Sequence, residues 1–353
     1  MSRSLFALAA SARQAPVRRA RLFLEALEGR CLLSYSVADL GTLGGPESYA
    51  RGLNASGQVA GYSSTAGGVP HAALFSNGLY DLGTLGGPES AAYALNDSGQ
   101  AAGYSTTGDS VQHAFLYDGT AMNDLGTLGG DNSGANGIND AGQVTGYSQI
   151  TGNGSFHAFL YDGTAMNDLG TLGGNTSSAF GINDAGQVAG WSQTARNAAV
   201  HAFLYDGTAM NDLGTLGGTN SEAFGINSAG QVAGWSQTAG DEATHAFLYD
   251  GTQMIDLGTL VGDGTSHALG INASGQVVGY ADTAGGAEHA FLYDGTAMND
   301  LNAQLPAGSG WVLLDATAIN DAGQVAGWGT HNGQYHAFLL TPLPSRSPPG
   351  AGR

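Results

Sequence analysis

Short runs of alternating apolar and polar residues, separated by turn residues, repeat along this chain. Within residues 175–218 there are four such runs, at 178–183, 187–192, 201–205 and 210–216. Alternation with a period of two, with Asp-Ala-Gly and Asp-Gly turns between the runs, is typical of β-strands. The 3.6-residue apolar period of a helix does not occur after residue 34. The pattern therefore predicts a unit of four short strands.

The unit occurs seven times. A His-Ala-Phe or His-Ala-Ala triplet recurs mostly at a spacing of 44 residues, beginning at His71, His113, His157, His201, His245, His289 and His336. An Asp-Leu pair recurs with it, at Asp39, Asp81, Asp124, Asp168, Asp212, Asp256 and Asp300. Four strands per unit of this length are typical of a propeller blade, because one four-stranded sheet needs flanking copies to bury its faces. Residues 35–342 are thus predicted to form an all-β, seven-bladed β-propeller.

The order of the motifs predicts how the ring closes. The first Asp-Leu pair precedes every triplet, whereas the last triplet, at His336, has no Asp-Leu pair after it. Residues 35–45 then supply a lone fourth strand, which we expect to pair near residues 336–340 and to complete the last blade. An open β-solenoid is the alternative architecture. It is less favoured because solenoid coils are usually shorter and their terminal repeats are atypical.

The segments outside the repeats differ in composition. Residues 1–34 hold six arginines and the apolar stretch 5–10, which is typical of an export segment, with an amphipathic helix as the alternative. Residues 24–34, Leu-Glu-Ala-Leu-Glu-Gly-Arg-Cys-Leu-Leu-Ser, resemble a leader found in many large bacterial extracellular proteins. The resemblance implies an extracellular or cell-surface location. Residues 343–353 are expected to form a disordered tail.

Charge narrows the classes of partner. Residues 35–342 contain 27 acidic residues against two arginines and no lysine, a net charge of −25. Such a surface repels phosphate backbones and attracts cations and basic partners, so nucleic-acid binding is not expected. Cys31 is the sole cysteine, which rules out an internal disulfide and a cysteine-based metal site. No apolar run reaches 18 residues, so we expect no membrane span. A monomer is expected.

Every repeat keeps an asparagine turn before its second strand. The asparagine is followed by glycine three residues later, glutamine, a second glycine and then Tyr or Trp, and it occurs at Asn54, Asn96, Asn139, Asn183, Asn227, Asn272 and Asn320. Together with the His-Ala-Phe triplets, these motifs resemble the HAF repeats of bacterial extracellular proteins over residues 35–342. The resemblance implies a secreted repeat protein and brings no family-wide catalytic residue.

The constant residues are interpreted as scaffold. Each histidine falls on the predicted third strand, two strand spacings of ~4.8 Å from the inner edge of the ring. Histidines on neighbouring blades therefore diverge too far to share an ion, whose ligands must approach to ~2.1 Å. We expect hydrogen bonds within each blade and no metal or catalytic role. The asparagine turn also lacks the spaced carboxylates of a calcium loop. This structural role is assigned to His113, His157, His201, His245, His289, His336, Asn139, Asn183 and Asn227.

The repeats diverge in two loops, one between the second and third strands and one between successive blades. In an antiparallel blade both loops emerge on the same face, here called the loop face, and binding residues often lie on such loops. The other interpretation is that these loops vary because nothing constrains them. The candidate ligand-binding residues on the loop face are Asp131, Glu222, Asp241, Glu242, Asp263, Asp282 and Glu288.

These features favour a secreted, non-catalytic binding or cell-surface structural protein that recognises a glycan, a cationic ligand or another protein. No cofactor is expected, with calcium left open. The alternative is a propeller-type carbohydrate-active enzyme, a glycoside hydrolase or lyase, with two carboxylates at the mouth of the ring. Such an enzyme needs unique inward acidic, His or Arg residues on one or two blades. The blades look nearly interchangeable, so no enzymatic activity is expected.

Overall fold

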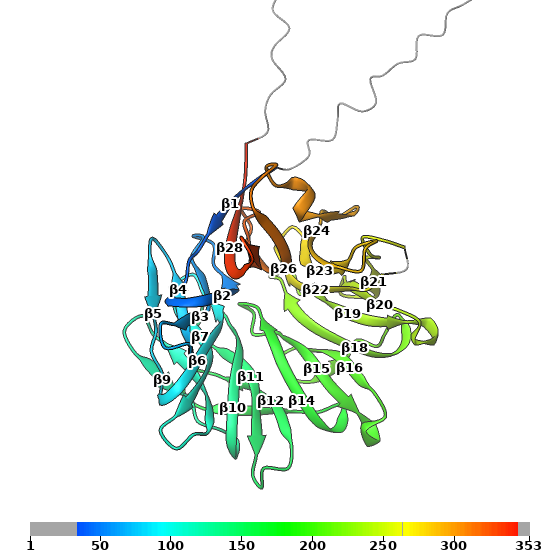
Figure 1. Cartoon of the computed structure of the whole chain (residues 1–353). Coiled ribbons are helices and arrows are strands. Elements are labelled where there is room, and N and C mark those ends of the chain that lie inside the picture. Colours follow the sequence, from blue (N-terminus) through cyan, green and yellow to red (C-terminus); the bar gives the residue numbers. More distant parts are fainter. Residues whose placement is uncertain (1–33, 263, 345–353) are drawn as a thin grey trace, which may run out of the picture. The chain divides into compact units, whose positions relative to one another are not determined.

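The computed structural model describes residues 34–262 and 264–344, which form seven four-stranded antiparallel sheets around a central channel (Figure 1). Each sheet is one blade, and in six of the seven the strands pair in sequence order, with the first strand innermost. The predicted seven-bladed β-propeller is confirmed, and the solenoid alternative is wrong. Residues 1–33 of the predicted leader and residues 345–353 of the predicted tail lie outside the described part.

Blades I to IV use the first half of the chain. Blade I is β2 (Gly44–Leu53), β3 (Val59–Thr65), β4 (Pro70–Phe75) and β5 (Leu79–Asp81); blade II is β6 (Gly86–Leu95), β7 (Ala101–Thr107), β8 (Gln112–Tyr117) and β9 (Met122–Asp124). Blade III is β10 (Gly129–Ile138), β11 (Val144–Ile150), β12 (Phe156–Tyr161) and β13 (Met166–Gly170); blade IV is β14 (Gly173–Ile182), β15 (Val188–Thr194), β16 (Val200–Tyr205) and β17 (Met210–Asp212).

Blades V to VII complete the ring. Blade V is β18 (Gly217–Ile226), β19 (Val232–Thr238), β20 (Thr244–Tyr249) and β21 (Met254–Asp256); blade VI is β22 (Ser266–Ile271), β23 (Val277–Asp282), β24 (Glu288–Tyr293) and β25 (Met298–Asp300). Blade VII is β26 (Trp311–Ile319), β27 (Val325–His331), β28 (Gln334–Pro342) and β1 (Tyr35–Asp39). The helices of the described residues are three short 3-10 turns, η1 (Ala195–Asn197), η2 (Ala239–Asp241) and η3 (Leu301–Gln304). None of these is long or apolar enough to cross a membrane.

The N-terminal strand closes the ring, as the motif order predicts. Strand β1 pairs antiparallel with β28, with Tyr35 opposite Pro342 and Asp39 opposite Phe338. In Figure 1 the blue β1 lies beside the red β28. The paired strand ends at Asp39 rather than at residue 45, and its partner residues are 338–342 rather than 336–340. Tyr35 is 1% exposed, so the closing strand is held by side-chain packing as well as by the ladder.

The constant asparagine turn joins the first two strands of each blade. In blade IV the Gly186 N–H donates to the Asn183 carbonyl at 2.9 Å. Gly186 has a φ of +77°, which favours glycine because a side chain is strained in the left-handed region. The Asn183 side chain accepts from the backbone N–H groups of Ala185 and Gln187. The turn thus fixes where each inner strand ends.

The hydrophobic core lies between blades rather than in one central mass. One cluster contains Phe203 and Val188 of blade IV with Ala158 of blade III. The inner strands of neighbouring blades pack so closely that a Cβ at Gly137 of β10 would stand 2.3 Å from the Phe180 carbonyl oxygen of β14. Small residues at the inner strands therefore let seven sheets converge on one channel.

Candidate functional site

The constant histidines all pair with the constant aspartates of the Asp-Leu motif. In every blade the histidine Nδ1 lies 2.8–2.9 Å from a carboxylate oxygen on the fourth strand of the same blade. The histidine side chains are 15–24% exposed. The pairs are His71–Asp81, His113–Asp124, His157–Asp168, His201–Asp212, His245–Asp256, His289–Asp300 and His336–Asp39. Each pair braces the outer two strands of its blade.

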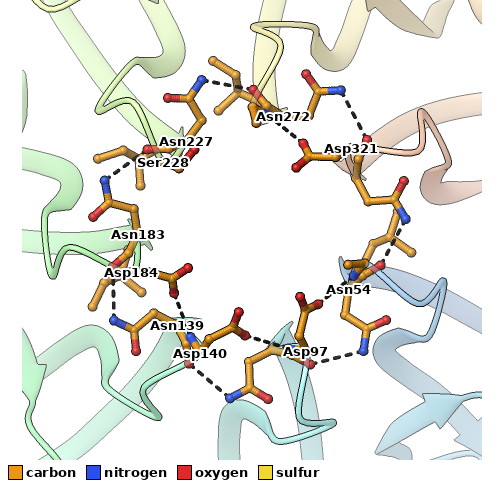
Figure 2. Close-up of a pocket in the computed structure, with 18 of the residues that line it drawn as sticks. Asn54, Asp97, Asn139, Asp140, Asn183, Asp184, Asn227, Ser228, Asn272 and Asp321 are labelled. Atoms are coloured by element: carbon orange, nitrogen blue, oxygen red, sulfur yellow. Dashed lines mark hydrogen bonds between the residues drawn. The ribbon is translucent and has the colours of Figure 1, made fainter.

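The constant asparagines form a closed hydrogen-bonded ring at one end of the channel, which Figure 2 shows from along the axis. Each Nδ2 donates to the backbone carbonyl of the asparagine in the next blade at 3.0–3.2 Å. The ring closes from Asn320 of blade VII to Asn54 of blade I at 3.1 Å. All seven side chains are 3–7% exposed. Inter-blade bonds of this kind tie the blades together around the axis.

Four carboxylates follow asparagines of this ring and also bond between blades. The Oδ1 atoms of Asp97, Asp140, Asp184 and Asp321 accept the backbone N–H of the equivalent residue in the preceding blade at 2.7–3.0 Å (Figure 2). In the other blades Ala55, Ser228 and Ala273 take this position. We therefore regard this end of the channel as structural.

The predicted ligand-binding residues do not form one site. Those described are Asp131 (β10), Glu222 (β18), Asp241 (η2), Glu242 (after η2), Asp282 (β23) and Glu288 (β24). Only neighbours in one hairpin meet: Asp282 lies opposite Glu288 across β23 and β24, and Asp241 adjoins Glu242. Asp263 lies outside the described residues.

Several of these carboxylates are engaged by other residues of their own blades. The Asp241 carboxylate accepts from the backbone N–H and the hydroxyl of Thr219, both at 2.7 Å. Asp282 does the same for Thr265, at 3.0 and 2.7 Å, and Asp131 accepts from an asparagine side chain in the next loop. Their geometry is that of loop anchors that join the second-to-third-strand loop to the start of the inner strand.

Glu222 is a correction to the sequence analysis. It lies within the inner strand β18, opposite Trp235 of β19, and not in a loop. The sequence analysis placed it on the loop face because it adjoins the variable Gly-rich segment, and this segment pairs at its ends in the blade ladder. Glu222 therefore belongs to the inner strand of blade V.

The inner strands line the channel in successive layers. Above the asparagine ring is an apolar belt formed by the residue before each asparagine: Leu53, Leu95, Ile138, Ile182, Ile226, Ile271 and Ile319. The next layer, here called the variable ring, consists of the residues three positions before each asparagine: Arg51, Tyr93, Asn136, Phe180, Phe224, Leu269 and Thr317. With Tyr147 these residues line a cavity of about 350 Å³. The cavity lies toward the loop face, because every inner strand runs from that face to its asparagine.

Arg51 carries the charge of the variable ring. Its guanidinium carbon stands 5.7 Å from the Tyr62 ring centroid and 5.9 Å from that of Tyr93, within the range of cation–π attraction. Its Nη2 donates to the Tyr62 hydroxyl at 3.4 Å, while its buried Nε–H has no partner among the described residues. An N–H group is thus held at the cavity wall with unused capacity to donate.

Asp315 is a buried carboxyl on β26, the inner strand next to that of Arg51. It is 8% exposed, and burial raises its pKa to about 6, against the lowering effect of the Arg51 charge. One carboxyl oxygen accepts from Trp328 Nε1 at 3.2 Å. The other has no partner among the described residues. Burying such an atom is costly unless it is hydrogen-bonded.

Glu222 and His267 occupy the same repeat position as Asp315, five residues before the asparagine. Burial raises the pKa of Glu222 to about 7, against a hydrogen bond from Trp235. Burial lowers the pKa of His267 to about 4, against the nearby charge of Asp282. The His267 ring stacks on Tyr280 at 4.7 Å between centroids. These groups lie on the inner strands of blades V to VII, two residues before the variable-ring positions, and are not among the residues that line the cavity.

The sequence analysis missed this variation along the inner strands. It treated the blades as nearly interchangeable, whereas their inner strands carry single Arg, Asp, Glu and His residues at two positions. The second position reads Tyr49, Ala91, Gly134, Ser178, Glu222, His267 and Asp315 through the seven repeats. Comparing the copies column by column over the first strand, instead of only over the loops, would have exposed this variation.

Comparisons with known proteins agree with the fold and assign no activity. A family model described as a protein of unknown function (DUF3466) matches residues 166–337, slightly less than half of the chain. No curated protein matches the sequence. The HAF resemblance and the leader thus stay predictions.

Two solved structures are similar in fold. The β-propeller domain of the Trilobed protease from Pyrococcus furiosus, described as having an open velcro topology, has a TM-score of 0.50 and 11% identity, covering 86% of this chain and all of that one. The extracellular domain of a putative one component system from B. thetaiotaomicron has a TM-score of 0.51 and 11% identity, over 87% of this chain but only 40% of that one. At such identities the likeness concerns the fold alone.

Proposed function

We propose that this chain is an exported, non-catalytic binding propeller whose ligand occupies the cavity at the variable ring. The supporting observation is where the repeats differ. The scaffold positions are constant in all seven blades, whereas the variable ring has a different residue in each blade, apart from the two blades that both carry phenylalanine. Arg51 Nε and an Asp315 oxygen at or beside this wall are buried without partners among the described residues. A concave site with aromatic walls and a few convergent polar groups is the usual form of a small-molecule site.

A glycan is the ligand class that this chemistry favours. The wall offers ring faces from Tyr93, Phe180 and Phe224 beside a guanidinium donor and an amide from Asn136. Hydroxyl groups can both donate to a carboxylate and accept from a guanidinium, and the apolar face of a sugar can pack on aromatic rings. The net charge of −25 over the repeats disfavours anionic ligands.

The test is a thermal-shift screen of the full chain against neutral and cationic glycans in 150 mM salt, followed by calorimetry on any ligand found. Arg51→Met and Phe180→Ala should each weaken binding about 10-fold or more, as expected for losing a charged hydrogen bond or a stacking face. Asp241→Asn, on the loop face, is the matched control and should bind as the parent does.

If Asp241→Asn weakens binding and Arg51→Met does not, the loop face is the binding site and the cavity assignment is wrong. If no glycan, basic protein or calcium raises the melting temperature, a cell-surface structural role becomes the better account.

A carbohydrate-active enzyme is the second candidate, and one observation favours it. Two inner-strand carboxyl groups, Glu222 and Asp315, have pKa values raised to about 7 and about 6, in the range of a general acid at neutral pH. Turnover of a bound glycan that is lost in Glu222→Gln or Asp315→Asn, with binding retained, would establish this candidate in place of the first.

A further inference from the structure

Blade VII departs from the other six at its His–Asp pair. Asp39 lies within hydrogen-bond distance of two imidazoles: Oδ2 is 2.9 Å from Nδ1 of His336, the constant histidine, and 3.0 Å from Nδ1 of His331. In the other blades the position of His331, six residues after the start of the second strand, is occupied by Thr65, Thr107, Ile150, Thr194, Thr238 and Thr283. His331 is therefore an addition to the shared scaffold.

The three side chains have the arrangement of a metal-binding set. Their ligand atoms all lie within 4.8 Å of one another, the one such group of three among the described residues. A tetrahedral ion with bonds of about 2.0–2.1 Å holds its ligand atoms roughly 3.3 Å apart. Each imidazole Nδ1 lies 2.9–3.0 Å from Asp39 Oδ2, so an ion needs these two separations to open by a few tenths of an ångström. The two imidazole planes are 69° apart, so the rings do not stack on each other. The side chains are 15–31% exposed, which leaves a path for entry.

Neighbouring residues hold His331 in place. Its ring stacks on Trp311 at 4.6 Å with an interplanar angle of 3°. Its Nε2 lies 3.3 Å from the side-chain amide of Asn332. When an ion takes the Nδ1 lone pair, the proton moves to Nε2, and the Asn332 amide, rotated by half a turn, presents its oxygen to accept that N–H. Such outer partners are the usual support of metal-binding histidines.

We propose that Asp39, His331 and His336 bind one divalent transition-metal ion, Zn²⁺ in the first place, with water at the fourth position. Two imidazoles and one carboxylate suit Zn²⁺, Cu²⁺ or Ni²⁺, whereas Ca²⁺ requires six to eight oxygen ligands. The ligands come from β1, β27 and β28, so the ion links the N-terminal strand to the last blade. In the other six blades a His–Asp pair offers two ligands, one fewer than the three of this site.

The experiment uses the full chain, freed of metal with a chelator and carrying no affinity tag. Calorimetry with Zn²⁺ in 150 mM salt should show one ion bound per chain, and Zn²⁺ should raise the melting temperature by mass action. Co²⁺ should give the visible absorption of a tetrahedral site. His331→Thr, which restores the residue of five other blades, should weaken Zn²⁺ binding by at least about 10-fold and abolish the melting shift.

The matched control is His201→Ala, which removes the histidine of an ordinary pair and should leave Zn²⁺ binding unchanged. Asp39→Asn provides a second loss variant that keeps a hydrogen-bond acceptor for one imidazole. If the parent binds no Zn²⁺ at micromolar concentration, or if His331→Thr binds it as the parent does, the site is only a carboxylate shared by two imidazoles and the proposal is wrong.

Discussion

At the scale of the residue, one amide closes a turn and joins two blades. The Asn183 Oδ1 accepts from the Gln187 N–H at 3.0 Å, and its Nδ2 donates to the Gln187 Oε1 at 2.8 Å and to the Asn227 carbonyl at 3.0 Å. Aspartate has a similar shape but no donor, so it would set a carboxylate against that carbonyl. This explains why asparagine, and never aspartate, stands at this position in all seven repeats.

We expect Asn183→Ala to lower the free energy of unfolding by about 1–3 kcal/mol, because it leaves buried polar groups of two blades without partners. Urea denaturation of the full chain measures the change. The control is Asp184→Ala, at an exposed neighbouring position where blades I and VI carry alanine, and it should cost less than about 1 kcal/mol. Equal losses in the two variants would show that the asparagine ring contributes little.

The half-buried Glu222 makes stability depend on pH. Its folded pKa of about 7 exceeds the ordinary value of 4.5, so between these pH values the folded state binds more protons than the unfolded state. The stabilising contribution is complete below pH 4.5 and is lost as the pH rises through about 7. Between pH 5 and 8 the free energy of unfolding should therefore fall less in Glu222→Gln than in the parent. The expected difference is about 1–3 kcal/mol, because each pKa unit corresponds to about 1.36 kcal/mol.

Urea denaturation across this pH range checks the effect, and His267 supplies a variant of opposite sign. Its pKa is lowered from 6.5 to about 4, so its contribution is present above pH 6.5 and lost as the pH falls through 4. His267→Asn should flatten the acid side of the profile. Identical profiles for the parent and Glu222→Gln would mean that Glu222 is solvated and ionised throughout.

At the scale of the element, the order and number of strands were predictable, but their ends were not. The inner strand of blade IV is Gly173–Ile182 rather than 178–183, because its first residues are glycine and polar and so carry no apolar alternation. Ser177 shows what replaces apolar contact there: it is fully buried, accepts from the Ala158 N–H at 2.8 Å and donates to the Gly170 carbonyl at 2.6 Å. Hydrophobic pattern cannot reveal strands that are held by such bonds.

The candidate site was predictable only in part, for a related reason. Constancy among repeats identified the scaffold, and the His–Asp and asparagine contacts follow from it. The cavity wall depends on which side chains of the first strand turn to the channel. A register irregularity in each inner strand, such as that between Ala50 and Gly52, shifts the alternation and places Arg51 in the cavity wall. A sequence analysis that assumes a regular two-residue period, with no bulge, does not predict that Arg51 faces the cavity.

At the scale of the whole molecule, the ring closes by contacts at two radii. Near the axis, the Asn320 side chain bonds to the Asn54 carbonyl at 3.1 Å, and the Ala337 N–H donates to Ser48 Oγ at 3.0 Å. At the rim, β1 completes blade VII. The inner contacts join blades I and VII as they join other neighbours. Blade VII, however, is the one blade whose fourth strand comes from the other end of the described chain.

Removing the closing strand should therefore weaken the propeller without erasing it. A form lacking residues 1–39 loses the buried Tyr35 and leaves β28 as an exposed edge, a defect of several kcal/mol at ~25 cal/mol per Å² of apolar surface and a template for aggregation. The matched control lacks only residues 1–33 and keeps β1. Both forms are measured by thermal unfolding and size-exclusion chromatography, with chelator present so that metal binding at Asp39 plays no part. Only the shorter form should show a lower melting temperature and self-association. Equal melting and equal solubility of the two forms would mean that the contacts near the axis suffice, and that β1 covers an edge the ring does not need to close.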